Sequence, residues 1–342
     1  MNDQRFPLTR LPAPCSQNVL RKMTPAELLK LSLLSKKAKD AVVSRNRKIK
    51  AIEVTIGNEI KVILDFGNIS SITNFKFHMT HERGAPKRVQ KPSYITFCEV
   101  IRYQVFKKFT WRNEKFEMED WINHLKTTFN QRETSIAFLQ TASQYDFNSI
   151  REHIKNPTCL HVHQTENFEF NRQVFKYFLP MKQLSLDTGV FENRRAPNHI
   201  IIQNLDRFTI MASEEKFTID DLLCTNSKEI ILYHSQLSRK DLNRFLRLWK
   251  AGCNIRMEKL FVRLPRNEGN EEEIMRRIQH QVVTREQNER RIFRRSCNGW
   301  EPCQGKGMDF YRFDGIKGTI CILNFDQEVY FYFFVWHDHC IG

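Results

Sequence analysis

Residues 6–44 read FPLTRLPAPCSQNVLRKMTPAELLKLSLLSKKAKDAVVS, and this stretch determines how the N-terminal part of the chain folds. Its apolar residues recur at helical spacing after the pair Leu11-Pro12. The run Thr24-Pro25-Ala26-Glu27 is typical of a helix start, because threonine caps the helix, proline takes its first position and Glu27 closes a capping box. The stretch therefore predicts three short helices that carry a row of leucines.

Such a leucine-rich segment has little of its own to bury those leucines on. Fewer than about 40 residues seldom bury enough surface to fold unaided. Two interpretations follow. The helices either dock on another protein, or they form an ordinary helical hairpin at the edge of a larger core of the same chain.

The order of the motifs favours the first interpretation. Leu-Pro at 11–12, Val-Leu-x-x-Met at 19–23, Leu-Leu-x-Leu at 28–31 and Leu-Ser-Lys-Lys at 34–37 follow one another. This order resembles the F-box, a domain that docks on the Skp adaptor of Skp–cullin–F-box ubiquitin ligases. One position departs from the family pattern, since Ala38 stands where an aromatic residue is common. The resemblance implies that the residues facing the adaptor are Pro7, Leu8, Leu11, Pro12, Val19, Leu20, Met23, Leu28, Leu31 and Leu34.

Strand-like segments recur at regular intervals in the middle of the chain. Short strand-like pieces start 22 to 30 residues apart, at Ile136, Leu160, Leu184, Phe208, Ile230 and Leu260. This spacing is close to the period of leucine-rich repeats, about 20 to 29 residues, in which a strand is followed by a helix. Helix signals lie between the strands, for example Ser238 as the cap and Gly252 as the stop of one helix. Strands joined by helices pair in parallel, so an α/β solenoid is expected.

A second resemblance covers part of this region. Residues 205–264, including FTIDDLLCTNSKEIILYHSQLSRKDLNRFLRLWKAGCNIRMEKLFVRL, resemble the F-box-associated type 2 domain. That domain follows an F-box in proteins that are regarded as substrate receptors. The resemblance extends more weakly from about residue 50 to the C-terminus, and the two motifs support each other.

The expected fold is α/β, or α+β overall. It consists of an N-terminal three-helix F-box, then an irregular leucine-rich-repeat-like α/β solenoid with a C-terminal β-strand cap. The predicted domains are the F-box at 1–48, a β-rich lead-in at 49–130, the solenoid of the F-box-associated domain at 131–265, and a basic helix with C-terminal β-strands at 266–342. The basic helix is expected within 271–295, which reads EEEIMRRIQHQVVTREQNERRIFRR.

Strand alternation predicts which side chains a client protein would meet. If residues such as Leu160 and Val162 point into the core, their neighbours face the open side of the sheet, and solenoids commonly bind along that side. The alternative is that the basic helix or the C-terminal strands cover this face. The predicted client-binding residues are His161, His163, Asp187, Arg207, Met211, Tyr233, Phe261 and Arg263.

Composition limits the other function classes. The 342 residues are 41% hydrophobic, and they contain neither a secretory signal nor an apolar run long enough to cross a membrane. Nine scattered cysteines indicate reduced thiols, and hence the cytoplasm or the nucleus. Cys297 and Cys303, with His337, His339 and Cys340 near the end, lack the tight cysteine pairs of zinc ribbons. No metal and no cofactor is therefore expected.

The net charge of +15 permits an acidic partner, including nucleic acid. No nucleic-acid-binding signature accompanies this charge, and no nucleotide cradle, nucleophile elbow or metalloprotease pair is present. The two family resemblances imply a non-catalytic subunit of a ubiquitin ligase complex, a substrate receptor that acts through protein–protein interaction in the ubiquitin conjugation pathway. Its partners would be a Skp-type adaptor with its cullin ubiquitin ligase and an unknown protein substrate. The alternatives are a nucleic-acid-binding protein and an interaction scaffold that does not deliver a client.

Overall fold

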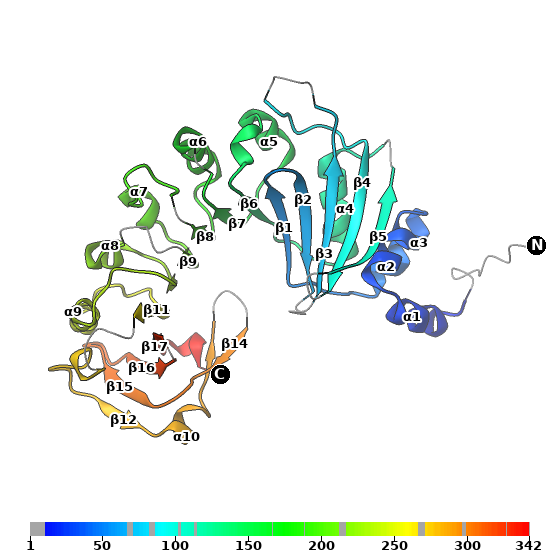
Figure 1. Cartoon of the computed structure of the whole chain (residues 1–342). Coiled ribbons are helices and arrows are strands. Elements are labelled where there is room, and N and C mark those ends of the chain that lie inside the picture. Colours follow the sequence, from blue (N-terminus) through cyan, green and yellow to red (C-terminus); the bar gives the residue numbers. More distant parts are fainter. Residues whose placement is uncertain are drawn as a thin grey trace, which may run out of the picture. The chain divides into compact units, whose positions relative to one another are not determined.

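The computed structural model describes residues 11–66, 71–81, 86–101, 104–112, 115–165, 167–187, 189–211, 217–265, 271–295, 299–325 and 327–341. The predicted contact residues Pro7 and Leu8 lie outside these ranges. The chain divides into two compact units, Met1–Thr158 and Cys159–Gly342, whose elements are labelled in Figure 1. The fold is mixed α/β, with helices at the N-terminus followed by many strands.

The three N-terminal helices that the sequence predicts are present. They are α1 (Ala13–Lys22), α2 (Pro25–Ser32) and α3 (Lys36–Ser44). The predicted capping box starts α2, since Thr24 N donates to Glu27 Oε2 at 2.7 Å and Glu27 N donates to Thr24 Oγ1 at 3.4 Å. Ser35 caps α3, because its Oγ accepts the Ala38 N–H at 3.1 Å.

A sheet and further helices complete the first unit. Its strands β1 (Ala51–Ile56), β2 (Ile60–Asp65), β3 (Ser71–His78), β4 (Tyr94–Ile101) and β5 (Gln104–Trp111) form an antiparallel meander. Strand β6 (Ser135–Phe138) pairs in parallel with β1. Helix α4 (Met118–Thr128) precedes β6, and η2 (Ala142–Gln144) and α5 (Phe147–His153) follow it. The first unit thus contains β6 and α5, which the predicted boundary at residue 131 assigns to the solenoid.

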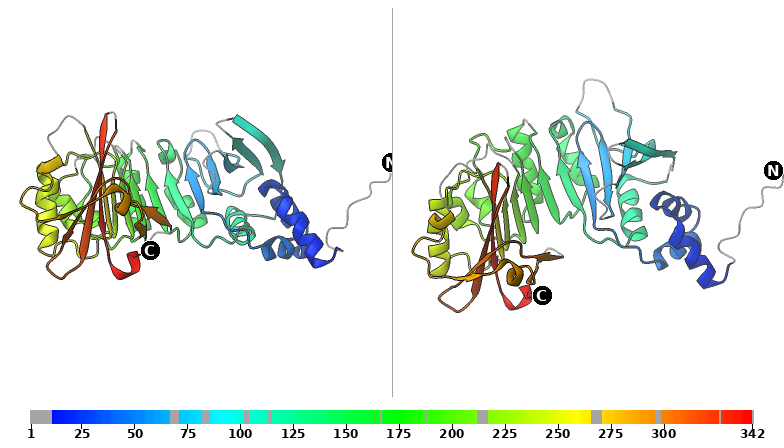
Figure 2. Two further views of the ribbon diagram at one scale, coloured as in Figure 1. Left: turned by 90° about the horizontal axis from the view of Figure 1, so that it is seen from below. Right: turned by 60° about the horizontal axis from the view of Figure 1, so that its bottom comes forward.

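The second unit contains the periodic strands. These are β7 (Cys159–Val162), β8 (Gln183–Leu186), β9 (Arg207–Ile210), β10 (Glu229–Leu232) and β11 (Lys259–Pro265), and neighbours pair in parallel. The helices between them are α6 (Phe168–Phe178), α7 (Asn198–Ile201), α8 (Ile219–Cys224) and α9 (Arg239–Lys250). They lie along one side of the strands, which Figure 2 shows in green and yellow.

The register explains why this sequence repeats. Leu160 pairs with Leu184, Leu184 with Phe208, Phe208 with Ile230, and Ile230 with Leu260. All five side chains are buried, so each strand adds one apolar residue to a continuous ladder under the helices. The predicted strand-and-helix period is confirmed here for β7 to β11. Its finer description as a leucine-rich-repeat-like solenoid stays a prediction.

Antiparallel strands extend this sheet beyond β11. In order they are β17 (Glu328–Val335), β16 (Lys317–Asn324), β15 (Gly307–Tyr311) and β12 (Gln281–Val283). A separate hairpin joins β13 (Ile292–Arg294) and β14 (Trp300–Pro302), and η4 (Asp338–Cys340) follows β17.

The predicted basic helix over 271–295 is wrong. The segment contains η3 (Glu271–Glu273), strand β12, the short helix α10 (Arg285–Asn288) and strand β13. Arg277 has a positive φ of 61°, which interrupts a helical path. Val282 and Val283 are β-branched and pair with Met308 and Gly307 of β15. A helical pattern in the sequence is therefore overridden by pairing with a strand that lies later in the chain.

Candidate protein-interaction surfaces

The predicted adaptor-facing residues divide into an outer and an inner group. Leu34, two residues after the end of α2, is 77% exposed, and Pro12 is also exposed. Four further residues are half-buried, namely Leu11, Val19, Met23 and Leu31. These six side chains offer apolar surface on the N-terminal helices.

Leu20 and Leu28 are in the inner group. Both are fully buried and pack with Val42 of α3, and Met23, Leu31 and Ala41 lie against this cluster. Their position differs from the prediction that they face a partner. Because three short helices need a core of their own, these two leucines hold α1, α2 and α3 together.

One side of α2 and α3 packs on α4, which belongs to the same unit. Ser32 is buried at the end of α2, and its Oγ lies 2.8 Å from His124 Nε2 and donates to the Leu29 carbonyl oxygen at 2.8 Å. The ammonium group of Lys30 lies 3.5 Å from the centre of the Phe109 ring. The segment therefore combines the two sequence interpretations, since it is attached to its own chain on one side and keeps Leu34 exposed.

The His124 imidazole in this contact is neutral. Burial lowers the pKa of His124 from its ordinary value of 6.5 to about 4, and the positive charge of Lys39 adds to this effect. The imidazole is therefore neutral at pH 7. Since the Ser32 hydroxyl donates to Leu29, the Nε2–H of His124 is the donor to Ser32 Oγ.

The predicted client face is partly accessible. Met211 is 45% exposed and Tyr233 is 37% exposed. His161 and His163 are half-buried, and His163 Nδ1 lies 3.1 Å from Asp187 Oδ2. The structure thus brings His163 and Asp187 together from neighbouring strands of the second unit.

The remaining three predicted residues of this face are engaged. Phe261 is only 7% exposed, because its ring contacts Tyr330 and Tyr332 of β17 at 5.5 and 5.0 Å between ring centres. The prediction that Phe261 is open is wrong, and the alternative that the C-terminal strands cover the face holds at this position. Arg263 pairs with Glu328 of the same strand β17.

Arg207 belongs to a row of paired charges in which Glu229 and Lys259 are buried. Its Nη2 lies 2.7 Å from Glu229 Oε2, and Glu229 is fully buried. Lys259, in the next strand, is also buried and pairs with Glu301. Burial lowers the pKa of Lys259, and Glu301 opposes this effect. Glu229 pairs with both Arg207 and Lys259 in the sheet register. The alternation of charge at equivalent positions of successive repeats could therefore have predicted this row from the sequence.

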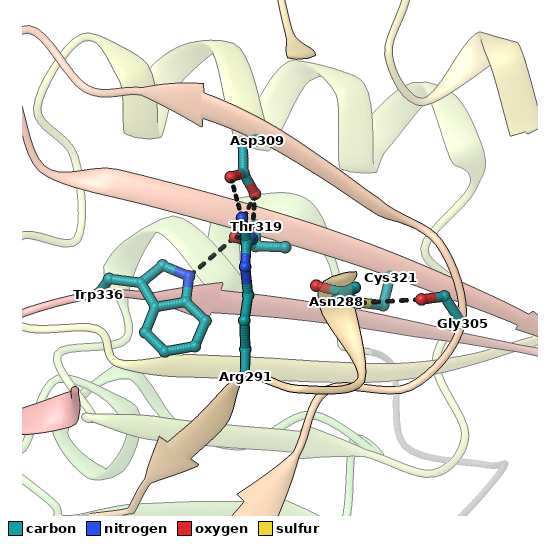
Figure 3. A network of polar contacts seen from close by, with 7 residues as sticks. All are labelled: Asn288, Arg291, Gly305, Asp309, Thr319, Cys321 and Trp336. Atoms are coloured by element: carbon teal, nitrogen blue, oxygen red, sulfur yellow. Dashed lines mark hydrogen bonds and ion pairs between the residues drawn. The ribbon is translucent and has the colours of Figure 1, made fainter. Parts of the chain in front are cut away.

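A second polar network lies among the antiparallel strands (Figure 3). Arg291 makes two hydrogen bonds to the Asp309 carboxylate, at 2.8 and 2.9 Å. Thr319 Oγ1 donates to Asp309 at 2.6 Å and accepts from Trp336 Nε1 at 2.8 Å. These contacts satisfy buried polar groups and join β15 and β16 to Trp336, the residue that follows β17, so the network has a structural role.

Sequence reasoning missed a cavity on the helix side of the second unit. Its volume is about 650 Å³, and it lies between α6 and α7. The rings of Phe175 and Phe191 stack in its wall, 5.3 Å apart. Arg172, Lys176 and His199 also line it. The cavity forms from two helices and the loop between them. No short sequence motif could therefore have predicted it.

Along the part of the chain that the structure describes, every helix is too short or too polar to cross a bilayer.

Two family comparisons agree with the geometry. Residues 8–50 match the F-box domain family, and residues 196–262 match the family described as F-box associated. No curated protein and no solved structure matches the chain. The chain thus carries an F-box at the helices α1 to α3 and an F-box-associated segment that spans α7 to β11.

Proposed function

We propose that this chain, which carries an F-box and an F-box-associated segment, is a substrate-recognition adaptor of a Skp–cullin–F-box ubiquitin ligase. Its N-terminal helices bind a Skp-type adaptor, and the rest of the chain holds a protein client for ubiquitination. The observation that carries the proposal is the difference in burial among the leucines of these helices. Leu20 and Leu28 form the core of the three helices, and Leu34 stays 77% exposed beside them.

The chain has no catalytic part in this proposal. It raises the rate of ubiquitin transfer by holding the client near a loaded conjugating enzyme, which turns a rare encounter into an effectively intramolecular one. The described cysteines are all free thiols, which is consistent with our proposal that the protein acts in the cytoplasm or the nucleus.

The adaptor contact is tested with the full chain and a purified Skp-type adaptor in a pull-down. Leu34→Glu places a charge on the exposed leucine and leaves the helix core intact, so we expect it to abolish recovery of the adaptor. The double substitution Leu11→Ala and Pro12→Ala should weaken recovery. Ile255→Glu is the matched control, because Ile255 is 58% exposed in the second unit. Undiminished recovery with Leu34→Glu would count against the proposed contact.

Client recruitment is tested by proximity labelling in cells treated with a proteasome inhibitor. We expect labelled proteins that depend on the second unit, and Tyr233→Ala with Met211→Ala should remove them if the client meets the strand face. Loss caused by Phe175→Ala and Lys176→Glu instead would place the client at the cavity between α6 and α7. The same client set from the unmodified chain and from all four substitutions would contradict recruitment by the second unit.

A nucleic-acid-binding function is the alternative, based on the net charge of +15. Several arginines and lysines are already paired with acidic groups, among them Arg207, Lys259 and Arg291. Nucleic-acid binding predicts retention on filters that falls steeply with salt. Absence of retention at low salt would remove this alternative.

A further inference from the structure

The ends of β11 and β17 bring two distant segments together in the second unit. Lys259 pairs with Phe334, and Val335 N donates to the carbonyl oxygen of Glu258 at 2.8 Å. His337 Nε2 lies 3.1 Å from the carbonyl oxygen of Met257. Glu258, just before β11, is thereby held beside η4.

Three side chains of different chemistry converge at this place. Glu258 Oε1 lies 3.0 Å from His339 Nε2, and one ligand atom each of Glu258, His339 and Cys340 lies within 4.8 Å of the other two. Glu258 and Cys340 are buried, and His339 is exposed. The group is therefore enclosed on the side of the carboxylate and the thiol and open to solvent on the side of the imidazole.

The carboxylate of Glu258 already contacts both of the other side chains. It is buried, its Oε1 lies 3.0 Å from His339 Nε2, and it shares a side-chain hydrogen bond with Cys340. Because buried charges in proteins are either paired or bound to metals, a cation at this place would exchange these contacts for bonds to the metal.

We propose that Glu258, His339 and Cys340 bind one zinc-class divalent cation, with water in the fourth position. A carboxylate, an imidazole and a thiolate are the ligand types of Zn²⁺, whereas Mg²⁺ and Ca²⁺ prefer sets of oxygen atoms. Donor atoms around a tetrahedral zinc ion lie about 3 to 4 Å apart, so small side-chain movements suffice. Binding releases the thiol proton of Cys340 to solvent, and the two negative charges of the ligands balance the ion.

This inference reverses the sequence expectation of no metal. That expectation considered Cys303 together with the C-terminal histidines and Cys340. In the structure Cys303 contacts Cys321 through a hydrogen bond, and the carboxylate ligand comes from Glu258, far away in the sequence. The metal would fasten η4 to the start of β11. It is independent of the proposed function, because it involves no residue of the N-terminal helices.

The experiment titrates Co²⁺ into the reduced, chelator-treated full chain and follows the absorption that a cobalt–thiolate bond produces. We expect one ion per chain, displaced by Zn²⁺. Loss of an outer hydrogen-bond partner typically costs about 10- to 100-fold in metal affinity. Loss of a direct ligand in His339→Ala or Cys340→Ser should therefore cost at least about 100-fold.

Two control variants separate the site from general thiol chemistry. His199→Ala removes an exposed histidine elsewhere in the second unit, which takes no part in holding Glu258 or η4, and it should keep the affinity. Cys224→Ser removes an exposed thiol elsewhere in the second unit and should also keep it. The folded state of each variant is checked by circular dichroism. Absence of the cobalt–thiolate absorption, or its persistence in both His339→Ala and Cys340→Ser, would overturn the assignment.

Discussion

The attachment of the N-terminal helices through His124 makes the stability of the first unit depend on pH. In the unfolded chain the imidazole takes up a proton near its ordinary pKa of 6.5, whereas in the folded chain its pKa is about 4. The folded pKa is lowered, so between these values the unfolded state binds the proton and the folded state does not. Stability conferred by neutral His124 is therefore present above pH 6.5 and is lost as the pH falls toward 4.

The size of the effect follows from the two pKa values. Each tenfold difference in proton affinity is worth about 1.4 kcal/mol, so the full loss near pH 4 is about 3 kcal/mol. Between pH 8 and pH 5 the linkage relation gives about 2 kcal/mol. His124→Gln removes the ionisable ring and keeps an amide that can donate to Ser32 Oγ.

The assay is urea unfolding of the full chain at pH 8 and pH 5, followed by hydrogen exchange of the α4 amides. Other groups also titrate in this range, so the informative quantity is the difference between the chain with His124 and the variant. We expect His124→Gln to lose about 2 kcal/mol less stability on going to pH 5. His199→Gln is a control at an exposed histidine of the second unit. An identical pH dependence for His124→Gln and the unmodified chain would refute the reasoning.

Three further substitutions test the packing. Leu28→Ala opens a cavity in the core of the N-terminal helices and should cost about 2 to 5 kcal/mol in denaturant unfolding; a cost below about 1 kcal/mol would contradict that core. Asp309→Ala leaves the half-buried Arg291 guanidinium without its carboxylate partner and should cost about 1.5 to 3 kcal/mol in thermal unfolding, and a neutral result would show that the network is dispensable. Gly318→Ala would place a Cβ 2.6 Å from Phe333 Cε2, so we expect a loss of about 1 to 3 kcal/mol, measured by calorimetry, unless the ring moves freely.

Local signals in the sequence predict the elements that depend on neighbouring residues. The capping box at Thr24 and the cap at Ser238 are both present, because capping involves only residues three positions apart. The stop at Gly252 is confirmed by its positive φ of 109°. The strand period also holds for β7 to β11, since one buried apolar ladder imposes it on each strand.

Features that depend on pairing between strands far apart in the chain could not be predicted from the sequence. Phe261 is covered by Tyr330 and Tyr332 because β17 pairs with β11 across a long separation in the chain. Long-range pairing also explains why the predicted basic helix is absent, since β12 within that segment pairs with β15. In the N-terminal segment the spacing of leucines located the helices. It did not separate the core residues Leu20 and Leu28 from the exposed Leu34, because all of them follow one helical pattern.

Hydrogen–deuterium exchange of the full chain, with and without a Skp-type adaptor, tests the central claim most directly. The claim is that a foreign subunit covers the apolar surface around Leu34 on helices that are already folded. We predict slower exchange across residues 11–44 on addition of the adaptor, while the strands β7 to β11 keep their exchange rates. Unchanged exchange across residues 11–44 at saturating adaptor would contradict the claim.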